Sequence, residues 1–208
     1  IIIYIIILLY LFLLYFFLIF SNKNYTNEYN EKNTFLLYQK NTEPLMRLAT
    51  LENIFGCDGK QLIVLPFKSY LLNLMDLYQE DKDHLNSIPG YQDYLDAATK
   101  QGYGFTVLDN GRPIVCFGIV PQWPGVAELW LIPDMKLMRK WKLKFHKGSL
   151  KFMELAADEL NLHRLHVTVS AQNVRAVKWI EHIYFKREGV LKKYSFNKKD
   201  MIMYSRLF

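Results

Sequence analysis

Hydrophobic and polar positions divide the chain into three segments. Residues 1–20 contain only Ile, Leu, Phe and Tyr, and the run matches the ~20 residues that a helix needs to cross a bilayer. Residues 21–60 have little periodicity and are rich in Asn, Lys, Glu, Thr and Tyr, which predicts a polar, partly disordered linker. From residue 61 onward, short apolar runs alternate with turn residues, so we expect an ordered domain at 61–208.

The apolar segment at residues 1–20 has two interpretations. It lacks the basic start and the small-residue cleavage site of a secretory signal. It is therefore either a true transmembrane anchor or a spurious extension without a function of its own. Only the first of these would attach the protein to a membrane.

The periodicity of residues 61–208 predicts an ordered series of strands and helices. Apolar runs and period-two alternation predict strands at 61–66, 103–107, 114–120, 126–132, 165–169, 190–196 and 201–206. Helical spacing of apolar residues predicts helices at 67–80, 91–100, 147–160 and 173–183. The resulting order is β-α-α-β-β-β-α-β-α-β-β. Hairpins combined with a helical crossover predict an α/β domain with a mixed, mostly antiparallel sheet flanked by helices.

Cysteine usage argues against two classes of protein. The chain has two cysteines, Cys57 and Cys116, with no CxxC motif and no histidine nearby at metal-ligand spacing. A disulfide framework and a structural zinc site are therefore not expected. Sparse thiols also suit a reducing cytosol better than an oxidising compartment.

Positive charge is concentrated in one stretch of the chain. The net charge is +6, and seven basic residues lie between positions 136 and 151, with no acidic residue before Glu154. These residues are Lys136, Arg139, Lys140, Lys142, Lys144, Lys147 and Lys151. They either form a local anion site or a solvated basic loop. No recognition helix or RNA-stacking motif accompanies them, which argues against nucleic acid as the partner.

Several short motifs share the spacing of one known family. The segment 163–194 contains a strand, an Asn-x-x-Ala helix start at 173–176 and a Phe-Lys-x-Glu-Gly strand at 185–189. A Met-Tyr-Ser-Arg strand follows at 203–206. Together these motifs resemble the GCN5-related N-acetyltransferases. The wording of residues 123–128 is also similar to GCN5-like proteins of tailed phages, some of which are internal virion proteins.

The resemblance implies acetyl-CoA as co-substrate, an amine of a small molecule or protein as acceptor, and no metal. It assigns Glu128 as the general base. The residues that it assigns to acetyl-CoA are the backbone of Leu131 and Ile132, then Arg139, Lys140, Lys147, Gly148 and Asn173. Alternatively, Glu128 is only a solvent-facing residue of its strand, and Asn173 is the N-cap of its helix.

The chain departs from the family pattern at the cofactor loop and at one helix position. The Gln/Arg-x-x-Gly-x-Gly/Ala loop that holds the pyrophosphate is absent, and Gly148 alone remains near the predicted helix start. Ile180 stands where many members have a Tyr that reprotonates the CoA thiolate, and Tyr184 replaces a usual Gly.

Two functions therefore compete. The first is an N-acetyltransferase that transfers an acetyl group from acetyl-CoA to an amine. The second is a catalytically silent domain of the same fold, serving as a structural or virion-associated phage protein with other virion proteins as partners. The corresponding location is cytoplasmic or virion-associated, and membrane contact is expected only through residues 1–20.

Overall fold

The computed structural model describes residues 47–100 and 103–208. The apolar segment at 1–20 and most of the predicted linker lie outside this part of the chain. Among the described residues, no helix combines the length and the apolar character that crossing a membrane requires.

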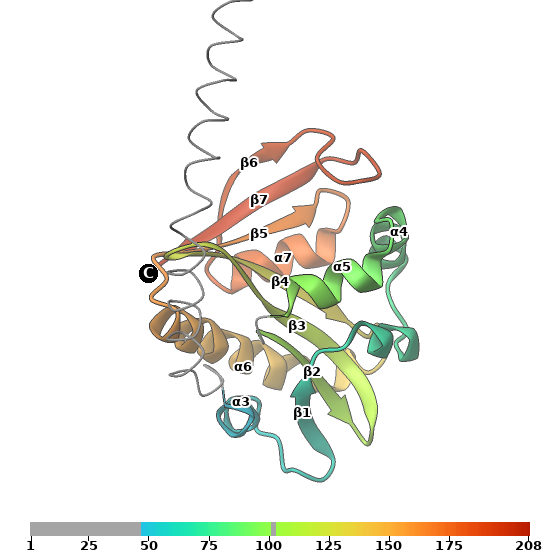
Figure 1. The fold of residues 1–208 in the computed structure, drawn as a ribbon, viewed down its shortest axis with the longest axis vertical. Helices are drawn as coiled ribbons and strands as arrows, with labels where there is room; N and C mark the ends of the chain where they lie inside the picture. The colour runs from blue at the N-terminus through green and yellow to red at the C-terminus, as the bar shows by residue number, and fades with distance from the viewer. Residues whose placement is uncertain (1–46, 101–102) are drawn as a thin grey trace, which may run out of the picture. The chain divides into compact units, whose positions relative to one another are not determined.

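Within the described residues, seven strands form one sheet in the order β1-β2-β3-β4-β5-β7-β6 (Figure 1). The strands are β1 (Leu62–Pro66), β2 (Gly104–Asp109), β3 (Arg112–Trp123), β4 (Val126–Pro133), β5 (Arg164–Ser170), β6 (Lys186–Leu191) and β7 (Met201–Leu207). Neighbouring strands are antiparallel except β4 and β5, which are parallel. The predicted mixed, mostly antiparallel sheet is confirmed.

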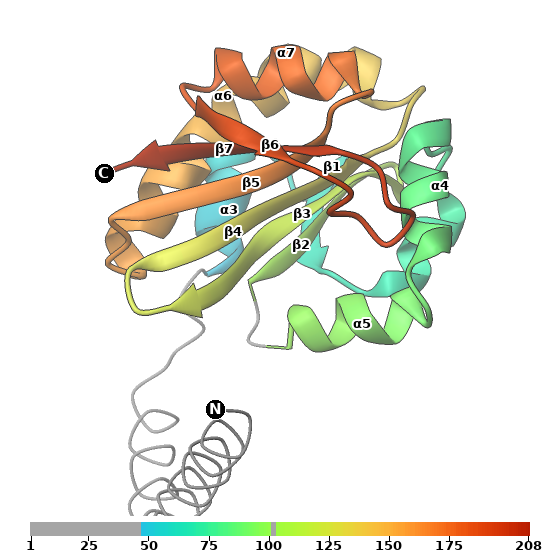
Figure 2. The same ribbon diagram turned by 90° about the horizontal axis from the view of Figure 1, so that it is seen from above.

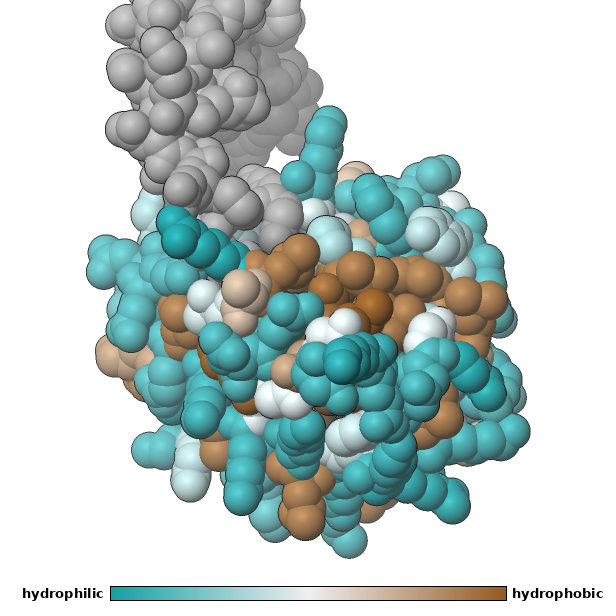
Figure 3. All heavy atoms as spheres, turned by 90° about the horizontal axis from the view of Figure 1, so that it is seen from below, coloured by the Kyte–Doolittle hydropathy of each residue, from teal (hydrophilic) through white to brown (hydrophobic). Residues whose placement is uncertain are grey.

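Helices cover both faces of this sheet (Figure 2). They are α3 (Leu48–Phe55), the 3₁₀ helix η1 (Ser69–Leu74), α4 (Gln79–Ser87), α5 (Tyr91–Ala98), α6 (Met138–Glu159) and α7 (Val174–His182). Helices α3, α6 and α7 contribute to the main core, while η1, α4 and α5 enclose a smaller core on the other face. In the view of Figure 3, hydrophilic residues surround a band of hydrophobic ones.

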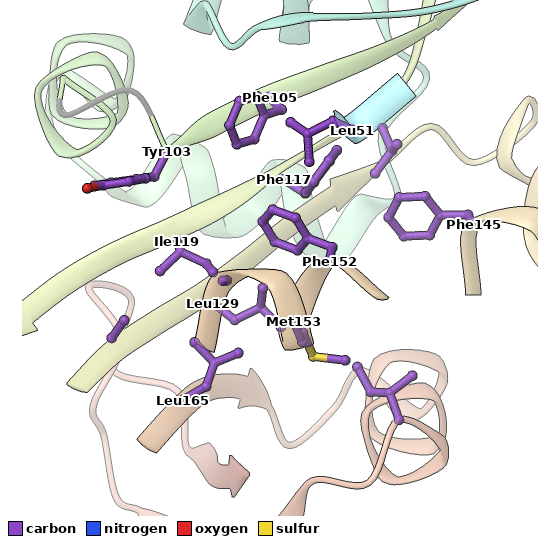
Figure 4. Close-up of a cluster of buried hydrophobic side chains, with 14 of the residues drawn as sticks. Leu51, Tyr103, Phe105, Phe117, Ile119, Leu129, Phe145, Phe152, Met153 and Leu165 are labelled. Carbon is purple, nitrogen blue, oxygen red and sulfur yellow. The ribbon is translucent and has the colours of Figure 1, made fainter. Parts of the chain in front are cut away.

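The main core contains a group of packed phenylalanines (Figure 4). The Phe117 ring of β3 lies 5.0 Å from Phe152 and 5.1 Å from Phe55, both in edge-to-face geometry. Phe55 also stacks on Phe145 of α6 at 5.4 Å between ring centroids. Such pairs stabilise the core beyond the area that they bury.

Helix α3 shows that the folded part begins before residue 61. Leu51 and Phe55 are 0% and 2% exposed, and both belong to the main core. The sequence predicts that residues 48–55 belong to the polar linker, because residues 21–60 taken together have little periodicity. Leu51 and Phe55 are four positions apart, so both lie on one face of the helix and are buried together.

Two other predicted elements are wrong in their bounds. The helix predicted at 67–80 is divided into η1 and α4, because Asp76 turns toward the segment after β4. The Asp76 N–H donates to Asp134 Oδ2 at 2.7 Å, and the Met135 N–H donates to the Asp76 carbonyl oxygen. The strand predicted at 190–196 ends at Leu191, and the chain then turns through Ser195 and Lys199.

Helix α6 begins at Met138, nine residues before the predicted start at 147. Gly148 therefore lies in the interior of the helix and not near its N-terminus. The Phe55 ring packs directly over it, since a Cβ added to Gly148 would lie 2.3 Å from Phe55 Cδ1. Gly148 serves the close approach of α3 to α6, and the prediction that it lies near the start of the helix is wrong.

Gly148→Ala should test this packing. In an ordinary helix interior, Ala is favoured over Gly by about 1 kcal/mol. Here the added methyl group overlaps the Phe55 ring, so we expect the free energy of unfolding to fall by ~1–3 kcal/mol in urea denaturation. The control is Gly189→Ala on β6, where an added Cβ meets no atom within 4 Å. A Gly148→Ala protein more stable than the parent would contradict the described contact.

Candidate active site

Strands β4 and β5 pair over only a short stretch and then diverge (Figure 1). Their register joins Val126 to Arg164, Ala127 to Leu165 and Glu128 to His166. Beyond Glu128, β4 stays paired with β3 as far as Pro133, and β5 stays paired with β7 as far as Ser170. In the described residues, the β4 edge that faces β5 therefore has no strand partner after Glu128.

A cavity of about 460 Å³ opens where the two strands separate. Its walls come from β4, β5, the first turns of α7, helices α4 and α5, and the loop between β6 and β7. A volume of this size is typical of small-molecule and cofactor sites. The cavity thus reaches from one face of the sheet to the other through the gap between β4 and β5.

Four of the predicted site residues line this cavity: Glu128, Leu131, Ile132 and Asn173. The other four, Arg139, Lys140, Lys147 and Gly148, do not line it. The structure therefore brings together the residues predicted for chemistry and for the cofactor arm. It leaves the residues predicted for the phosphates on α6.

Glu128 is the last β4 residue that pairs with β5. Thr168 Oγ1 donates a hydrogen bond to Glu128 Oε1 at 3.3 Å. The carboxylate is only partly exposed and lines the cavity, so it is not simply a solvent-facing strand residue. It is held where the two strands begin to separate.

His166 stands opposite Glu128 in the strand register. Burial lowers the pKa of the His166 imidazole, although the charge of Glu128 acts in the opposite direction. Its Nδ1 is buried without a hydrogen-bond partner in the described part of the chain. The histidine next to Glu128 is therefore neutral over more of the pH range than a solvated one.

Asn173 caps helix α7. Its Oδ1 accepts a hydrogen bond from the Ala176 N–H at 3.1 Å, which confirms the predicted N-cap. Among residues 47–100 and 103–208, its amide nitrogen has no hydrogen-bond partner. The cap and a contact with a ligand in the cavity are therefore compatible.

Lys140 is directed to the end of β2. Its Nζ lies 3.2 Å from Asp109 Oδ2 and 4.6 Å from the centre of the Trp141 ring. The Trp141 Nε1–H donates to the same Asp109 oxygen at 2.8 Å. Burial acts to raise the pKa of Asp109, but hydrogen bonds from Gln61, Trp141 and Lys140 outweigh it and lower that pKa. Lys140 therefore neutralises a structural carboxylate.

Arg139 and Lys147 are both exposed on α6 but lie far apart along it. Eight residues at 1.5 Å each place Lys147 about 12 Å further along the axis. Arg139 belongs to the first turn, where helix N–H groups and the dipole favour an anion. The prediction that Lys147 lies at the helix start is wrong, because α6 begins earlier.

Sequence patterns missed the cavity wall formed by α4, α5 and the β6–β7 loop. This wall contains Glu80, Asp81, His84, Tyr94, Tyr194 and Phe196. The acids resemble the solvated face of an ordinary helix, and the aromatic residues lie in segments with no known motif. No local signal in the sequence indicates that these three segments meet.

Asp81 is the most perturbed carboxylate of the cavity. Burial, the largest cause, and the neighbouring charge of Glu80 together raise the pKa of Asp81 to about 6 against the opposing effect of Arg175. Burial also lowers the pKa of His84, one turn later on the same helix. Both shifts have the partial burial of these two side chains as their largest cause.

The helix position that departs from the family pattern lies in the cavity wall. Ile180 is 2% exposed and lines the cavity, so no hydroxyl is present at that point. Tyr184 is 68% exposed and lies near Arg206, with the guanidinium carbon 5.9 Å from its ring centre. It does not line the cavity and does not replace the missing phenol.

The described domain is similar to several solved acetyltransferases. A GNAT-family acetyltransferase from Bacillus anthracis matches with a TM-score of 0.53 and 19% identity, over 71% of this chain and 95% of that chain. Ard1 from Thermoplasma volcanium matches with a TM-score of 0.57 and 11% identity, over 71% and 97%. A variant of the spermidine N-acetyltransferase from Vibrio cholerae matches with a TM-score of 0.53 and 19% identity, over 71% and 94%. The chain has the fold of the GCN5-related N-acetyltransferases.

At sequence identities of 11–19%, the similarity to these acetyltransferases shows the fold alone. No protein-family model matches the sequence, and no curated protein does so. None of these three structures is described as a phage protein, so the relation to phage proteins stays a prediction. Within the described residues, no group of His, Cys, Asp and Glu is arranged to hold a metal ion.

Two substitutions of Asn173 should separate its cap from any contact with a ligand. Asn173→Ala should lower the free energy of unfolding by about 0.5–2 kcal/mol, since the α7 N-terminus loses its acceptor. Asn173→Ser keeps an acceptor oxygen and should restore most of this loss in urea denaturation. Neither variant has the amide nitrogen, so both should bind acetyl-CoA more weakly than the parent. Normal acetyl-CoA affinity in both variants would leave Asn173 as a cap alone.

Proposed function

We propose that this protein is an N-acetyltransferase that transfers an acetyl group from acetyl-CoA to an amine. The observation that carries the proposal is the divergence of β4 and β5 after Glu128, which leaves a free strand edge along a cavity. The fold alone does not specify a function, so the proposal rests on this site.

The cavity suits the thioester arm of acetyl-CoA. The unpaired β4 edge, which includes Leu131 and Ile132, presents the backbone N–H and C=O groups of every second residue to an extended chain. The Asn173 amide nitrogen has no partner in the described residues. Acetyl-CoA would supply the activated acetyl group. The pyrophosphate would lie at the first turn of α6, next to Arg139.

Glu128 would accept the proton of the amine. An ammonium group is not nucleophilic, so a carboxylate at the cavity wall must remove its proton directly or through water. Thr168 fixes one Glu128 oxygen and leaves the other available. Ile180 lies at the position of the family's tyrosine and has no proton to donate to the leaving thiolate.

Glu128→Gln should show whether this carboxylate acts as the base. The substitution keeps the shape and an acceptor for Thr168 but accepts no proton, so we expect turnover to fall by ~10²–10⁴-fold. Acetyl-CoA affinity should change little. Turnover is measured with acetyl-CoA on a panel of amines, and binding by calorimetry.

The matched control is Asp158→Asn, which removes an exposed carboxylate of α6 outside the cavity. This variant should keep the parental turnover. If Glu128→Gln also keeps it, Glu128 is not the base. If the parent binds no acetyl-CoA at all, the proposal fails and the catalytically silent alternative replaces it.

Arg139→Ala and Lys147→Ala should differ in their effect on acetyl-CoA affinity. Loss of a charge-assisted hydrogen bond at the first turn of α6 should weaken binding by about tenfold or more, since such bonds contribute roughly 1.5–3 kcal/mol. Lys147→Ala should have little effect, and the difference should shrink at high salt. Equal losses in calorimetry would show that the general charge of α6 attracts the ligand.

A further inference from the structure

We propose that the acceptor is a small aliphatic amine with a second positive charge, and that Asp81 and Glu80 bind this second charge. The inference rests on the proposed function, because the amine is an acetyl acceptor only if the protein is an acetyltransferase. The amine binding that it predicts does not require acetyl-CoA. It specifies the substrate class of the same cavity.

The charges that line the cavity have one sign. The full chain has 26 Lys and Arg residues and a net charge of +6, yet no Lys or Arg lines the cavity among the described residues. Three carboxylates do, namely Glu80, Asp81 and Glu128. A cavity of this composition favours a cation and disfavours an anionic acceptor.

The carboxylates come from two different elements. Glu128 lies on β4, whereas Glu80 and Asp81 lie in the first turn of α4. Glu80 is already partly neutralised by Arg175 of α7, whose Nη2 lies 3.4 Å from Glu80 Oε2. Asp81 has no ion-pair or hydrogen-bond partner in the described part of the chain. A cation bound there would compensate an otherwise unpaired carboxylate.

Aromatic side chains complete this part of the cavity. Tyr94 of α5 and Tyr194 and Phe196 of the β6–β7 loop line it and are exposed at the surface. Figure 2 shows this loop next to α4. Aromatic faces attract ammonium groups and also accommodate methylene chains. An aliphatic chain between two ammonium groups therefore matches the aromatic and acidic walls together.

Two separated acidic positions favour a diamine over a monoamine. The amine near Glu128 must lose its proton before it reacts, so it cannot keep a charge-assisted bond there. A second ammonium at Asp81 keeps its charge throughout and holds the acceptor in place. Binding energy at this remote point would orient the reacting amine.

The test is calorimetric titration of the full-length protein with 1,5-diaminopentane and with n-pentylamine, without acetyl-CoA. The two probes have the same chain length and differ in the second ammonium group. We expect the diamine to bind at least about tenfold more tightly. Asp81→Asn should remove most of this advantage. The control Asp83→Asn, on the exposed side of the same helix and outside the cavity, should preserve it.

The preference should also depend on pH. Asp81 has a pKa of about 6, so it is neutral and binds a cation weakly below that value, and the diamine advantage should grow as the pH rises through it. The neighbouring charged or titratable groups are Glu80 and His84 of α4, Glu128 of β4, Arg175 of α7 and Lys199 of the β6–β7 loop. The part of the pH dependence of the diamine advantage that is present in the parent and absent in Asp81→Asn is due to the titration of Asp81.

Equal affinities for the two probes, or an Asp81→Asn protein that keeps the diamine advantage, would overturn the inference. Should Asp81→Asn fail to show a cooperative melt, Asp81→Ser takes its place with the same expectation. Turnover distinguishes this failure from failure of the proposed function. If a monoamine is acetylated as fast as the diamine, the inference is refuted and the proposed acetyltransferase function stands. If the protein prefers the diamine but binds no acetyl-CoA, the proposed function is refuted and the diamine site stands.

Discussion

The short pairing of β4 with β5 is the constraint on which the rest of the site depends. Each strand is held along its whole length on its other side, β4 by β3 and β5 by β7. These two pairs separate once the three shared positions end at Glu128 and His166. Unpaired backbone in a protein interior must find a partner, so the gap is a natural place for an extended ligand.

The separation of charge follows from this geometry. Six of the seven clustered basic residues belong to a long helix, α6, and Lys136 lies just before it. None of them lines the cavity, whose described walls contain only acidic charges. Lys140 pairs with Asp109 and Lys136 with Asp76, at 3.2 and 2.7 Å. Two of the seven clustered cations thus have ion-pair partners, and of the other five only Arg139 lies in the first turn of α6.

The α3–α6 contact shows that Gly148 serves helix packing and is not a remainder of the glycine loop that the chain lacks. Gly148 allows Phe55 to approach α6, and Phe55 joins the phenylalanines that fix α6 against β3. The first turn of α6 contains Met138, Arg139, Lys140 and Trp141, so it has no glycine. Any phosphate there must be held by the helix N-terminus and a side chain, and not by a closely approaching glycine backbone.

The sequence by itself determined the succession of strands along the chain, the mixed sheet and the cap at Asn173, because period-two alternation, turn residues and capping are local properties. It also brought Glu128, Leu131, Ile132 and Asn173 to one site through a family resemblance. Only the tertiary structure decided the start of α6, since a run of like charges conceals the helical spacing of Trp141, Phe145 and Phe152. It alone brought Asp81, Tyr94 and Tyr194 to one cavity, because contacts between segments so far apart in the chain leave no periodic pattern in any of them.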